Sequence, residues 1–266
     1  MYSVNYHRAS SLDEAAKLIA SAEDGKLVSG GMTLIPAMKT RLAAPSDLVD
    51  LRHIKDLKGI QVSGRDVRIG AGTTHAEVAA SRELKSACHA IVHLAGHIGD
   101  PHVRHMGTIG GSIANNDPAA DYPSAMLALG ATIVTSKREI KADDFFTGMF
   151  ETALEDGEIV KAVKFTGPDK CGYAKFPNPA SRYAMTGVFV ARRGNEVRVA
   201  VTGAGDNGVF RATELEAALS KSFDPSALDG ASVSADTMMS DIHASAEYRA
   251  NLVVVMAKRA VAAANA

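Results

Sequence analysis

The segment from residue 106 to residue 123, MGTIGGSIANNDPAADYP, decides how this chain is interpreted. It sets a glycine pair between two hydroxyl residues, and these four are Thr108, Gly110, Gly111 and Ser112. Adjacent glycines have no Cβ, so their backbone N–H groups can point together into a concavity that a ligand approaches closely. We expect a strand over 109–114 at this turn. The short polar side chains that follow suit a ribose or another polyol: Asn115, Asn116 and Asp121.

The segment SGGMT at 29–33 repeats this design after a predicted strand. Its residues are Ser29, Gly30, Gly31, Met32 and Thr33. Neither segment carries the Lys-Ser/Thr pair with which a P-loop binds phosphate and magnesium. One such turn by itself indicates no more than a tight bend. Two in one chain, the second followed by a polar run, favour a receptor for a diphosphate.

Length and composition are those of an ordinary globular protein. The chain has 266 residues, 46% hydrophobic and 22% charged, with a net charge of −1, which suits one large domain or two of moderate size. The near-neutral charge and the lack of a basic run argue against nucleic-acid binding. The N-terminus has no signal-peptide pattern, and the apolar run at 252–256 is too short to span a bilayer. We therefore expect a soluble, cytoplasmic protein, not an integral membrane protein.

The cysteines and histidines give little support for a metal site. Cys88 and Cys171 are far apart in the sequence and form no C-x-x-C pair, so we expect neither a disulfide framework nor a cysteine-ligated zinc or iron–sulfur centre in this chain. His89, His93 and His97 have the spacing of one helix face, which can bind zinc. No H-E-x-x-H pattern accompanies them, so we prefer packing and predict no metal.

Hydrophobic periodicity predicts an α+β fold. Ser11 and Glu14 form a capping box for a helix that we expect to stop near Gly25. Alternating segments at 60–72 and 184–205 predict hairpins, the second turning at Gly194 and Asn195. Further helices are predicted at 74–81, 86–99, 123–130, 212–221 and 246–264. Helices and strands alternate irregularly, and this favours α+β over a doubly wound sheet.

Two local patterns have plainer interpretations. The glycines of VAVTGAGDNG match G-x-G-x-x-G after a predicted strand, at Gly203, Gly205 and Gly208. No second strand with an acidic end follows at the required distance, so we interpret this turn as the exit of a hairpin leading to a helix at Thr213. Asp117 before Pro118 is typical of a helix N-cap and first helical position.

Several of these segments together resemble one known family. VSGGMTLIPAMKTRLAAPSDLVDL (28–51) and IGDPHVRHMGTIGGSIANNDPAADYPSAMLALGA (98–131) are similar to the two FAD-binding signatures of the medium subunit of molybdenum hydroxylases, which include xanthine dehydrogenase and aerobic carbon monoxide dehydrogenase. KFPNPASRYAMTGV (175–188) and VAVTGAGDNGVFRATELEAAL (199–219) resemble that family's C-terminal flavoprotein domain, most closely on the carbon monoxide dehydrogenase side.

This resemblance covers almost the whole chain and implies its domain organisation. Two lobes, over 1–56 and 57–167, would form a FAD-binding domain of the PCMH/VAO-like fold. The remainder, 168–266, would form an antiparallel sheet-plus-helix domain like the C-terminal domain of the carbon monoxide dehydrogenase flavoprotein.

The resemblance also implies the cofactor contacts, position by position. The first pyrophosphate loop would be Ser29 to Thr33, in which Ser29 and Met32 depart from the family's usual alanine and polar residue. The second would be Thr108 to Ser112, Ile109 included. The other implied contacts are an aspartate, two apolar residues near the flavin, a lysine and an aromatic covering the ring: Asp121, Ile98, Val160, Lys175 and Tyr183. No catalytic side chain is implied, because a flavin carries the redox chemistry itself.

The partners implied are an iron–sulfur small subunit with [2Fe–2S] clusters and a molybdopterin large subunit with the molybdenum cofactor, in a dimer of heterotrimers. FAD in this chain would pass electrons from those clusters to a quinone, NAD, O2 or a soluble carrier. Two alternatives remain open at this point. A stand-alone FAD-dependent reductase of the same fold is disfavoured by the C-terminal signature. A binding or assembly protein that has lost FAD is disfavoured by the intact glycine turns.

Overall fold

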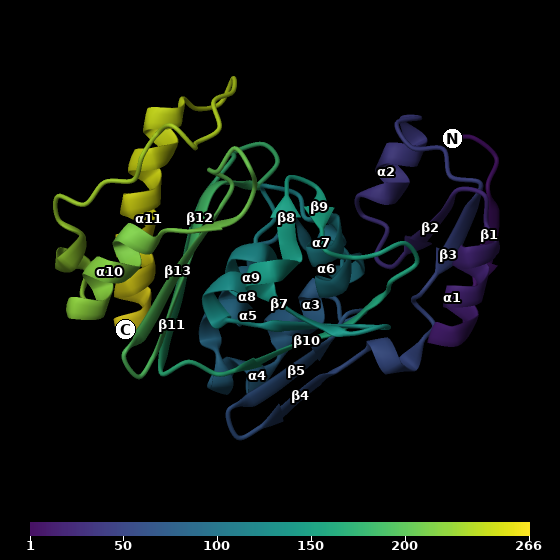
Figure 1. Ribbon diagram of the computed structural model, residues 1–266, viewed down its shortest axis with the longest axis horizontal. Helices are drawn as coiled ribbons and strands as arrows, with labels where there is room; N and C mark the ends of the chain where they lie inside the picture. The colour runs from purple at the N-terminus through teal and green to yellow at the C-terminus, as the bar shows by residue number, and fades with distance from the viewer.

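The computed structural model describes all 266 residues and arranges them around three larger sheets that follow one another along the chain, with a two-stranded sheet beside the second (Figure 1). The first sheet is parallel, in the order β1-β3-β2. Its strands and adjoining helices are β1 (Asn5–Arg8), α1 (Leu12–Ser21), β2 (Gly25–Val28), α2 (Leu34–Lys39) and β3 (Asp47–Asp50). The short 3-10 helix η1 (Lys55–Leu57) leads out of this part.

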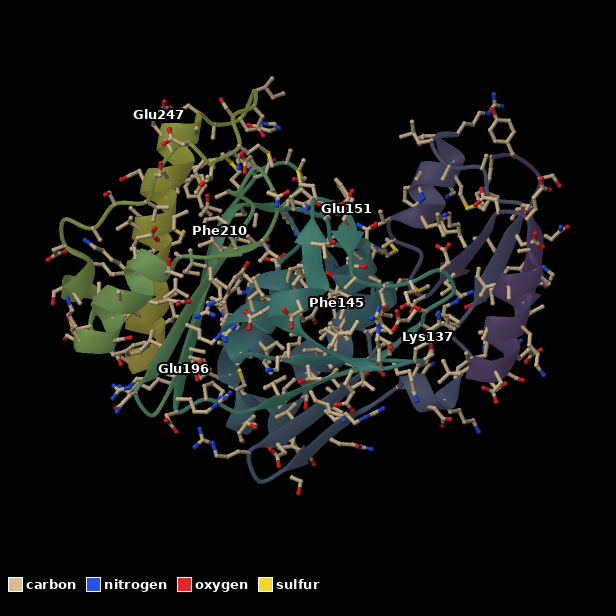
Figure 2. All side chains as sticks on the ribbon, viewed as in Figure 1. Lys137, Phe145, Glu151, Glu196, Phe210 and Glu247 are labelled. Atoms are coloured by element: carbon tan, nitrogen blue, oxygen red, sulfur yellow. The ribbon has the colours of Figure 1, made fainter.

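The second sheet is antiparallel, in the order β4-β5-β10-β6-β7. Its strands are β4 (Ile60–Ser63), β5 (Asp66–Gly70), β6 (Thr132–Thr135), β7 (Glu139–Lys141) and β10 (Val160–Thr166). The helices of this part are α3 (His75–Ala80), α4 (Arg82–Ala87), α5 (His89–Gly96), α6 (Pro101–Met106), α7 (Ile109–Asn115), α8 (Tyr122–Leu129) and α9 (Ala142–Phe145). The hairpin of β8 (Phe146–Gly148) and β9 (Glu151–Thr152) follows α9. Phe145, fully buried, belongs to the largest apolar core of the molecule (Figure 2).

The third sheet is antiparallel, in the order β11-β12-β13-β14. Its strands are β11 (Lys170–Pro177), β12 (Ala184–Arg193), β13 (Glu196–Thr202) and β14 (Phe210–Arg211). One face packs on α11 (Ala246–Asn265), with α10 (Thr213–Lys221) and η2 (Pro225–Leu228) beside it (Figure 1). The other face turns toward the second part of the chain, and α5 and α8 contact it. No helix of the chain is long and apolar enough to cross a membrane.

The predicted mixed architecture is confirmed, and so are several of its details. β12 and β13 form the expected hairpin, in which Gly194 has the left-handed φ of +56° that its turn requires. The G-x-G-x-x-G turn leaves this hairpin, passes through β14 and reaches α10, which begins at Thr213 as expected. Ser11 accepts a hydrogen bond from the Glu14 N–H, but the Glu14 carboxylate binds Ser10, so only half of the capping box forms. The helix ends at Ser21, and Gly25 instead begins β2.

The strand expected at 109–114 is wrong, because these residues form helix α7. Thr108 caps it by accepting a hydrogen bond from the Gly111 N–H at 3.2 Å, and its two isoleucines are buried in the core. Two adjacent glycines lower intrinsic helix propensity, and tertiary packing overrides that preference here. Asp117 does not begin a helix either. It accepts a hydrogen bond from the Ala119 N–H in a turn, and α8 begins only at Tyr122.

Candidate cofactor-binding site

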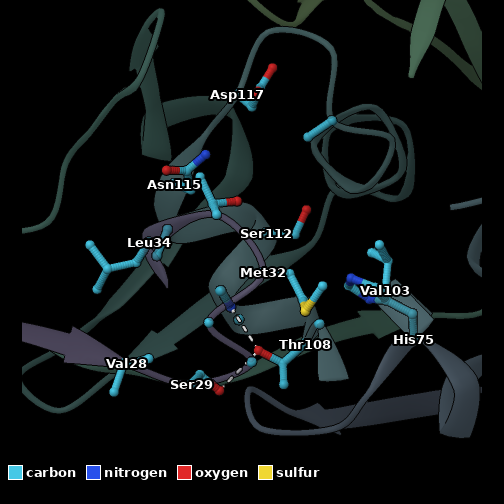
Figure 3. A pocket seen from close by; sticks show the side chains of 18 of the residues that line it. Val28, Ser29, Met32, Leu34, His75, Val103, Thr108, Ser112, Asn115 and Asp117 are labelled. Carbon is cyan, nitrogen blue, oxygen red and sulfur yellow. Dashed lines mark hydrogen bonds between the residues drawn. The ribbon is translucent and has the colours of Figure 1, made fainter. Parts of the chain in front are cut away.

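The main cavity of the molecule, about 830 Å³, lies where the three parts meet. Its walls come from the end of β2, helix α7, the turn at 116–121, the start of β10 and the loop at 180–183. Segments from residue 26 to residue 183 therefore form one site. Figure 3 shows the first glycine loop and the start of α7 side by side in its wall.

The first glycine loop offers a continuous row of backbone donors. None of the N–H groups from Ser29 to Leu34 has an acceptor within the protein, although all six residues line the cavity. Gly31 has a φ of +71°, which turns the chain sharply between β2 and α2. A Cβ on Gly30 would lie 2.2 Å from the carbonyl oxygen of Met106, so only glycine lets this loop approach the second one. Successive free N–H groups around a concavity are a receptor for an anion.

The second glycine loop contributes differently from what the sequence suggests. The Ile109 N–H donates to Thr73 at 3.1 Å and the Gly110 N–H to Ala71 at 2.8 Å, so the fold itself uses these donors. What faces the cavity is a pair of hydroxyls, Thr108 and Ser112, and the Thr108 Oγ1 lies 3.0 Å from the Oγ of Ser29 (Figure 3). This hydrogen bond joins the two loops.

The two adjacent glycines of α7 have separate roles. A Cβ on Gly110 would lie 2.4 Å from the Cβ of Ala71, so this glycine is needed for packing against the strand end. A Cβ on Gly111 would meet only the Thr108 Oγ1, at 3.1 Å. Gly111 lines the cavity, so the absence of a side chain there leaves space for a ligand and is not required for packing within the protein.

The polar turn after α7 only partly faces the cavity. Asn115 and Asp117 line it (Figure 3). Asn116, which we expected among the ligand-facing groups, does not. It has a left-handed φ of +43°, and its amide donates to the carbonyls of Gly148 and Glu151, both at 2.8 Å. Asn116 therefore attaches the turn to the β8–β9 hairpin.

Asp121 lies in the cavity wall at the start of α8 and is only 4% exposed. Its Oδ1 accepts a hydrogen bond from the Tyr173 hydroxyl and forms an ion pair with Lys175 Nζ at 2.9 Å. Burial raises the pKa of Asp121, and the Lys175 charge and the Tyr173 hydrogen bond oppose this shift. Lys175 also donates to the His97 carbonyl oxygen at 2.9 Å. Lys175 does not line the cavity. The charged group with which it pairs is the Asp121 carboxylate.

The other predicted contacts divide into two groups. Most line the cavity: Met32, Thr33, Ile98, Val160 and Tyr183. Tyr183 is 48% exposed beside the cavity, and its pKa is raised by partial burial and by the charges of Asp117 and Asp121. Ile109 is fully buried in the core and does not reach the cavity.

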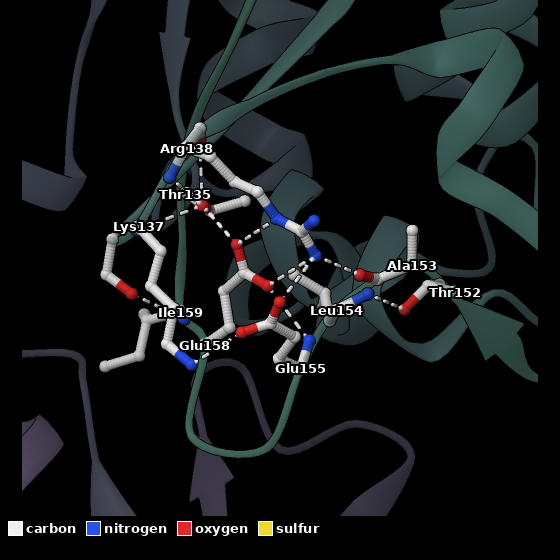
Figure 4. Close-up of polar contacts among 10 residues, drawn as sticks. Thr135, Lys137, Arg138, Thr152, Ala153, Leu154, Glu155, Glu158 and Ile159 are labelled. Atoms are coloured by element: carbon white, nitrogen blue, oxygen red, sulfur yellow. Dashed lines mark hydrogen bonds and ion pairs between the residues drawn. The ribbon is translucent and has the colours of Figure 1, made fainter.

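Two cavity residues were missed at the level of sequence. His75, 5% exposed, lies in the first turn of α3, and burial together with the Arg104 charge lowers its pKa to about 4. Its Nδ1 has no partner in the protein. Glu158 is buried, and hydrogen bonds from Arg138, the Glu155 N–H and Thr135 outweigh the opposing effect of burial and lower its pKa to about 2 (Figure 4). The Thr74–Glu77 capping box marks the helix that carries His75, but nothing in the sequence marks Glu158.

The two cysteines are close in space, which their separation in the sequence did not suggest. Cys88, between α4 and α5, and Cys171, on β11, are buried free thiols with their Sγ atoms 3.6 Å apart. Of the three histidines at 89, 93 and 97, only His89 interacts with this pair, through Cys171, and the three do not gather around one point. The rings of His93 and His97 are 4.2 Å apart at their centroids, and His97 Nδ1 bonds the His93 carbonyl oxygen at 2.8 Å.

The residues of this cavity fit a flavin adenine dinucleotide. The row of free N–H groups at 29–34 suits the diphosphate, and the hydroxyl and amide side chains nearby suit a sugar. Apolar side chains that include Ile98 and Val160, with the aromatic Tyr183, supply a surface for a flat ring. The three-part fold and this cavity define a flavoprotein of the two-lobed FAD-binding class.

Comparison with known proteins gives the family. Residues 2–165 match the model of the FAD binding domain in molybdopterin dehydrogenase, and residues 173–264 match that of the CO dehydrogenase flavoprotein C-terminal domain. The nicotine 6-hydroxylase medium subunit of Paenarthrobacter nicotinovorans is 33% identical over 99% of this chain and 98% of its own length. The carbon monoxide dehydrogenase medium chain of Afipia carboxidovorans is 36% identical over 99% of this chain and 97% of its own. A solved structure of CO dehydrogenase from Oligotropha carboxidovorans superposes with a TM-score of 0.88 at 36% identity, covering 99% of this chain and 98% of that one.

The chain belongs to the FAD-binding medium subunits of the molybdenum hydroxylases. The predicted family, the oxidoreductase class, FAD as cofactor and the FAD-binding domain followed by an antiparallel C-terminal domain are thereby confirmed. The relatives are named as subunits of larger enzymes, and those from nicotine 6-hydroxylase and carbon monoxide dehydrogenase are named as medium subunits.

Proposed function

We propose that this chain is the electron-transfer subunit of a molybdenum hydroxylase. Its FAD would take electrons from [2Fe–2S] clusters in an iron–sulfur small subunit, after a molybdopterin large subunit has oxidised the substrate. The flavin would pass them to a terminal acceptor, which is a quinone, NAD, O2 or a soluble carrier. The complex is proposed to be a dimer of heterotrimers. Its relatives' description as medium chains supports partners of smaller and larger size.

The observation that carries this proposal is the distribution of donors and acceptors in one cavity. Free N–H groups lie along Ser29 to Leu34, and an anionic carboxylate on Asp121 lies elsewhere in the same wall. A ligand that meets both needs a negative group for the loop and a hydrogen-bond donor for the carboxylate. FAD has both features, and when bound it supplies the capacity to collect two electrons.

The chain's own residues would bind and orient this cofactor rather than perform acid–base chemistry. The 29–34 loop would hold the diphosphate, and Thr108 and Ser112 would add hydroxyls beside it. Tyr183 would cover the ring and limit the approach of water and of acceptors. Burial and the Arg104 charge hold His75 in its neutral form.

We also propose domain boundaries near 56/57 and 167/168. Residues 55–57 form the short helix that links the first sheet to the second. The two matched family models leave residues 166–172 between them, where the chain passes from β10 to β11.

The glycine pair of α7 allows a direct test of the flavin site. We expect Gly111→Val to remove most bound FAD while the apo chain keeps its stability, because its Cβ would enter the cavity and meet only Thr108 Oγ1. Gly110→Val should lower stability, since its side chain would overlap Ala71. FAD content after gel filtration and the urea midpoint of the apo chain separate the two effects. Full FAD content in Gly111→Val would overturn the assigned site.

Electron transfer is tested in the assembled complex. Substrate added under anaerobic conditions should bleach iron–sulfur absorbance first and flavin absorbance afterwards, and the acceptor should reoxidise both. In a Gly111→Val complex, the clusters should still be reduced while acceptor turnover is lost. Normal acceptor turnover without flavin would refute the relay.

A further inference from the structure

Strand β11 presents three side chains in succession to the FAD-binding part of the chain. Successive side chains of a strand alternate between its two faces, so Cys171, Tyr173 and Lys175 share one face. Cys171 meets Cys88, and the other two meet Asp121. The opposite face carries Gly172, whose Cβ position would lie 1.9 Å from the Ala260 carbonyl oxygen of α11. The position of β11 is therefore fixed from both sides.

The hydroxyl of Tyr173 reaches Asp121 because neighbouring strands leave room for it. A Cβ on Gly187, in strand β12, would lie 2.6 Å from the Tyr173 hydroxyl oxygen. The Tyr173 ring packs beside Phe189 on the same strand, with centroids 6.1 Å apart. At 3% exposure Tyr173 has no access to solvent that could replace its bond to Asp121.

The same sheet also holds the turn that carries Asp121. The Thr202 hydroxyl donates to the carbonyls of Pro118 and Ala120, at 3.0 and 2.6 Å, and the Gly203 N–H donates to Pro118 at 2.8 Å. Both the backbone before Asp121 and its carboxylate are thus fixed by the C-terminal sheet.

The two oxygens of the Asp121 carboxylate differ in their environment. Oδ1 accepts a hydrogen bond from Tyr173 and forms an ion pair with Lys175, whereas Oδ2 has no hydrogen-bond partner within the protein. Oδ2 is not one of the fully buried side-chain atoms that lack a hydrogen-bond partner, so it keeps some exposed surface. Asp121 lines the cavity. The free oxygen is therefore available to a donor on a ligand in the cavity.

We infer that Tyr173 is a positioning residue of the flavin site: with Lys175 it engages Oδ1 of Asp121, so that Oδ2 alone faces the cavity as a hydrogen-bond acceptor. This inference rests on the flavin site proposed above. Tyr173 does not touch the ligand and acts only through Asp121. A bound flavin meets this acceptor with an N–H or O–H donor.

The inference predicts a particular pH dependence. Without the Tyr173 hydroxyl, the Asp121 carboxylate loses one hydrogen bond and takes up a proton at higher pH. A protonated Asp121 can present a donor instead of the acceptor that the ligand requires, so FAD affinity falls. A hydrogen bond to a charged group corresponds to a shift of about 1–2 pH units in this transition.

The experiment compares Tyr173→Phe with Tyr122→Phe in the full-length chain. Tyr122 is the matched control, because it is also fully buried and its hydroxyl has no partner in the protein. FAD affinity is measured by flavin fluorescence between pH 5 and 8, with the urea midpoint of the apo protein recorded at each pH. We expect the loss of affinity on acidification to begin about 1–2 pH units higher in Tyr173→Phe than in the parent and in Tyr122→Phe.

Three results would overturn the inference or locate its failure. A pH profile of Tyr173→Phe that superposes on the parent profile refutes the positioning role. An equal loss of affinity at every pH shows a packing effect and refutes it as well. If neither the parent chain nor the Gly111→Val chain binds FAD, the result refutes the proposed flavin site and not the role of Tyr173.

Discussion

Replacement of Lys175 by methionine tests how the flavin site is stabilised. The side chains of Lys175 and Asp121 are 7% and 5% exposed, and their N–O distance is 2.9 Å. Methionine keeps most of the apolar stem but leaves the Asp121 charge buried, with only Tyr173 as a donor. Removing one partner of a buried ion pair costs about 3–5 kcal/mol. We expect the free energy of unfolding of apo Lys175→Met to fall by about that amount.

The double variant Lys175→Met/Asp121→Asn isolates the electrostatic part of this loss. An asparagine carries no charge, and its Oδ1 can still accept from Tyr173. We expect the double variant to lie within about 2 kcal/mol of the parent, because replacing both partners of a buried pair is often nearly neutral. The matched control is Lys164→Met, whose partner Glu139 is exposed. That exposed pair contributes about 0–1 kcal/mol.

Urea unfolding of the apo chains, followed by far-UV circular dichroism, measures these differences. A Lys175→Met chain as stable as Lys164→Met would refute the buried ion pair. Equal losses in the single and double variants would show that methionine packs poorly and that charge compensation is not the cause.

Three further predictions concern ionisation and accessibility. Because the pKa of Glu158 is lowered to about 2, stability present above its unfolded pKa of about 4.5 should be lost as the pH falls toward 2. Arg138→Met should make the free energy of unfolding depend less on pH in this range. An unchanged pH dependence would contradict the Arg138–Glu158 ion pair. The pKa of His75 is lowered to about 4, so on acidification the unfolded chain takes up a proton before the folded chain does. The free energy of unfolding should therefore fall as the pH decreases from about 6.5 to 4. His75→Gln should remove this pH dependence, and a pH dependence that persists would belong to another group. Cys88 and Cys171, 1% and 3% exposed, should react with a thiol reagent only after denaturation, and a fast-reacting thiol in the native chain would contradict their burial.

The sequence predicts the elements of this fold better than the contacts of its site. The β12–β13 hairpin and the long helix α11 follow from local periodicity and turn residues, and the structure confirms both. Helix α7 does not follow, because two glycines make a poor local helix and its stability comes from tertiary contacts, which include burial of its isoleucines and the bonds to Ala71 and Thr73. The closeness of Cys88 and Cys171 depends on the docking of β11 against α5, which no local pattern encodes.

Within the site, the sequence identifies which loops are permissive but not which donors are free. Both glycine loops contain a Gly-Gly pair, a serine and a threonine. The N–H groups of the 29–34 loop are free, whereas two N–H groups of the α7 loop donate to the carbonyl oxygens of Thr73 and Ala71. The difference arises from the neighbours of each loop: no protein acceptor lies within reach of the 29–34 N–H groups, whereas the α7 loop docks on the turn after β5. A glycine pair in a sequence therefore indicates that another group approaches the backbone closely at that point. Only the fold decides whether that group belongs to the protein backbone or to a ligand.

The placement of Asp121 extends the same reasoning to charge. A buried carboxylate is costly unless its surroundings compensate it, and here its hydrogen bond and its ion pair both come from residues more than fifty positions later, on β11. The FAD-binding part of the chain cannot hold that carboxylate in its observed state without the C-terminal sheet. We therefore propose that the C-terminal domain is part of the flavin site and not only a cover for it. Detaching it should cost FAD affinity even where both glycine loops remain intact.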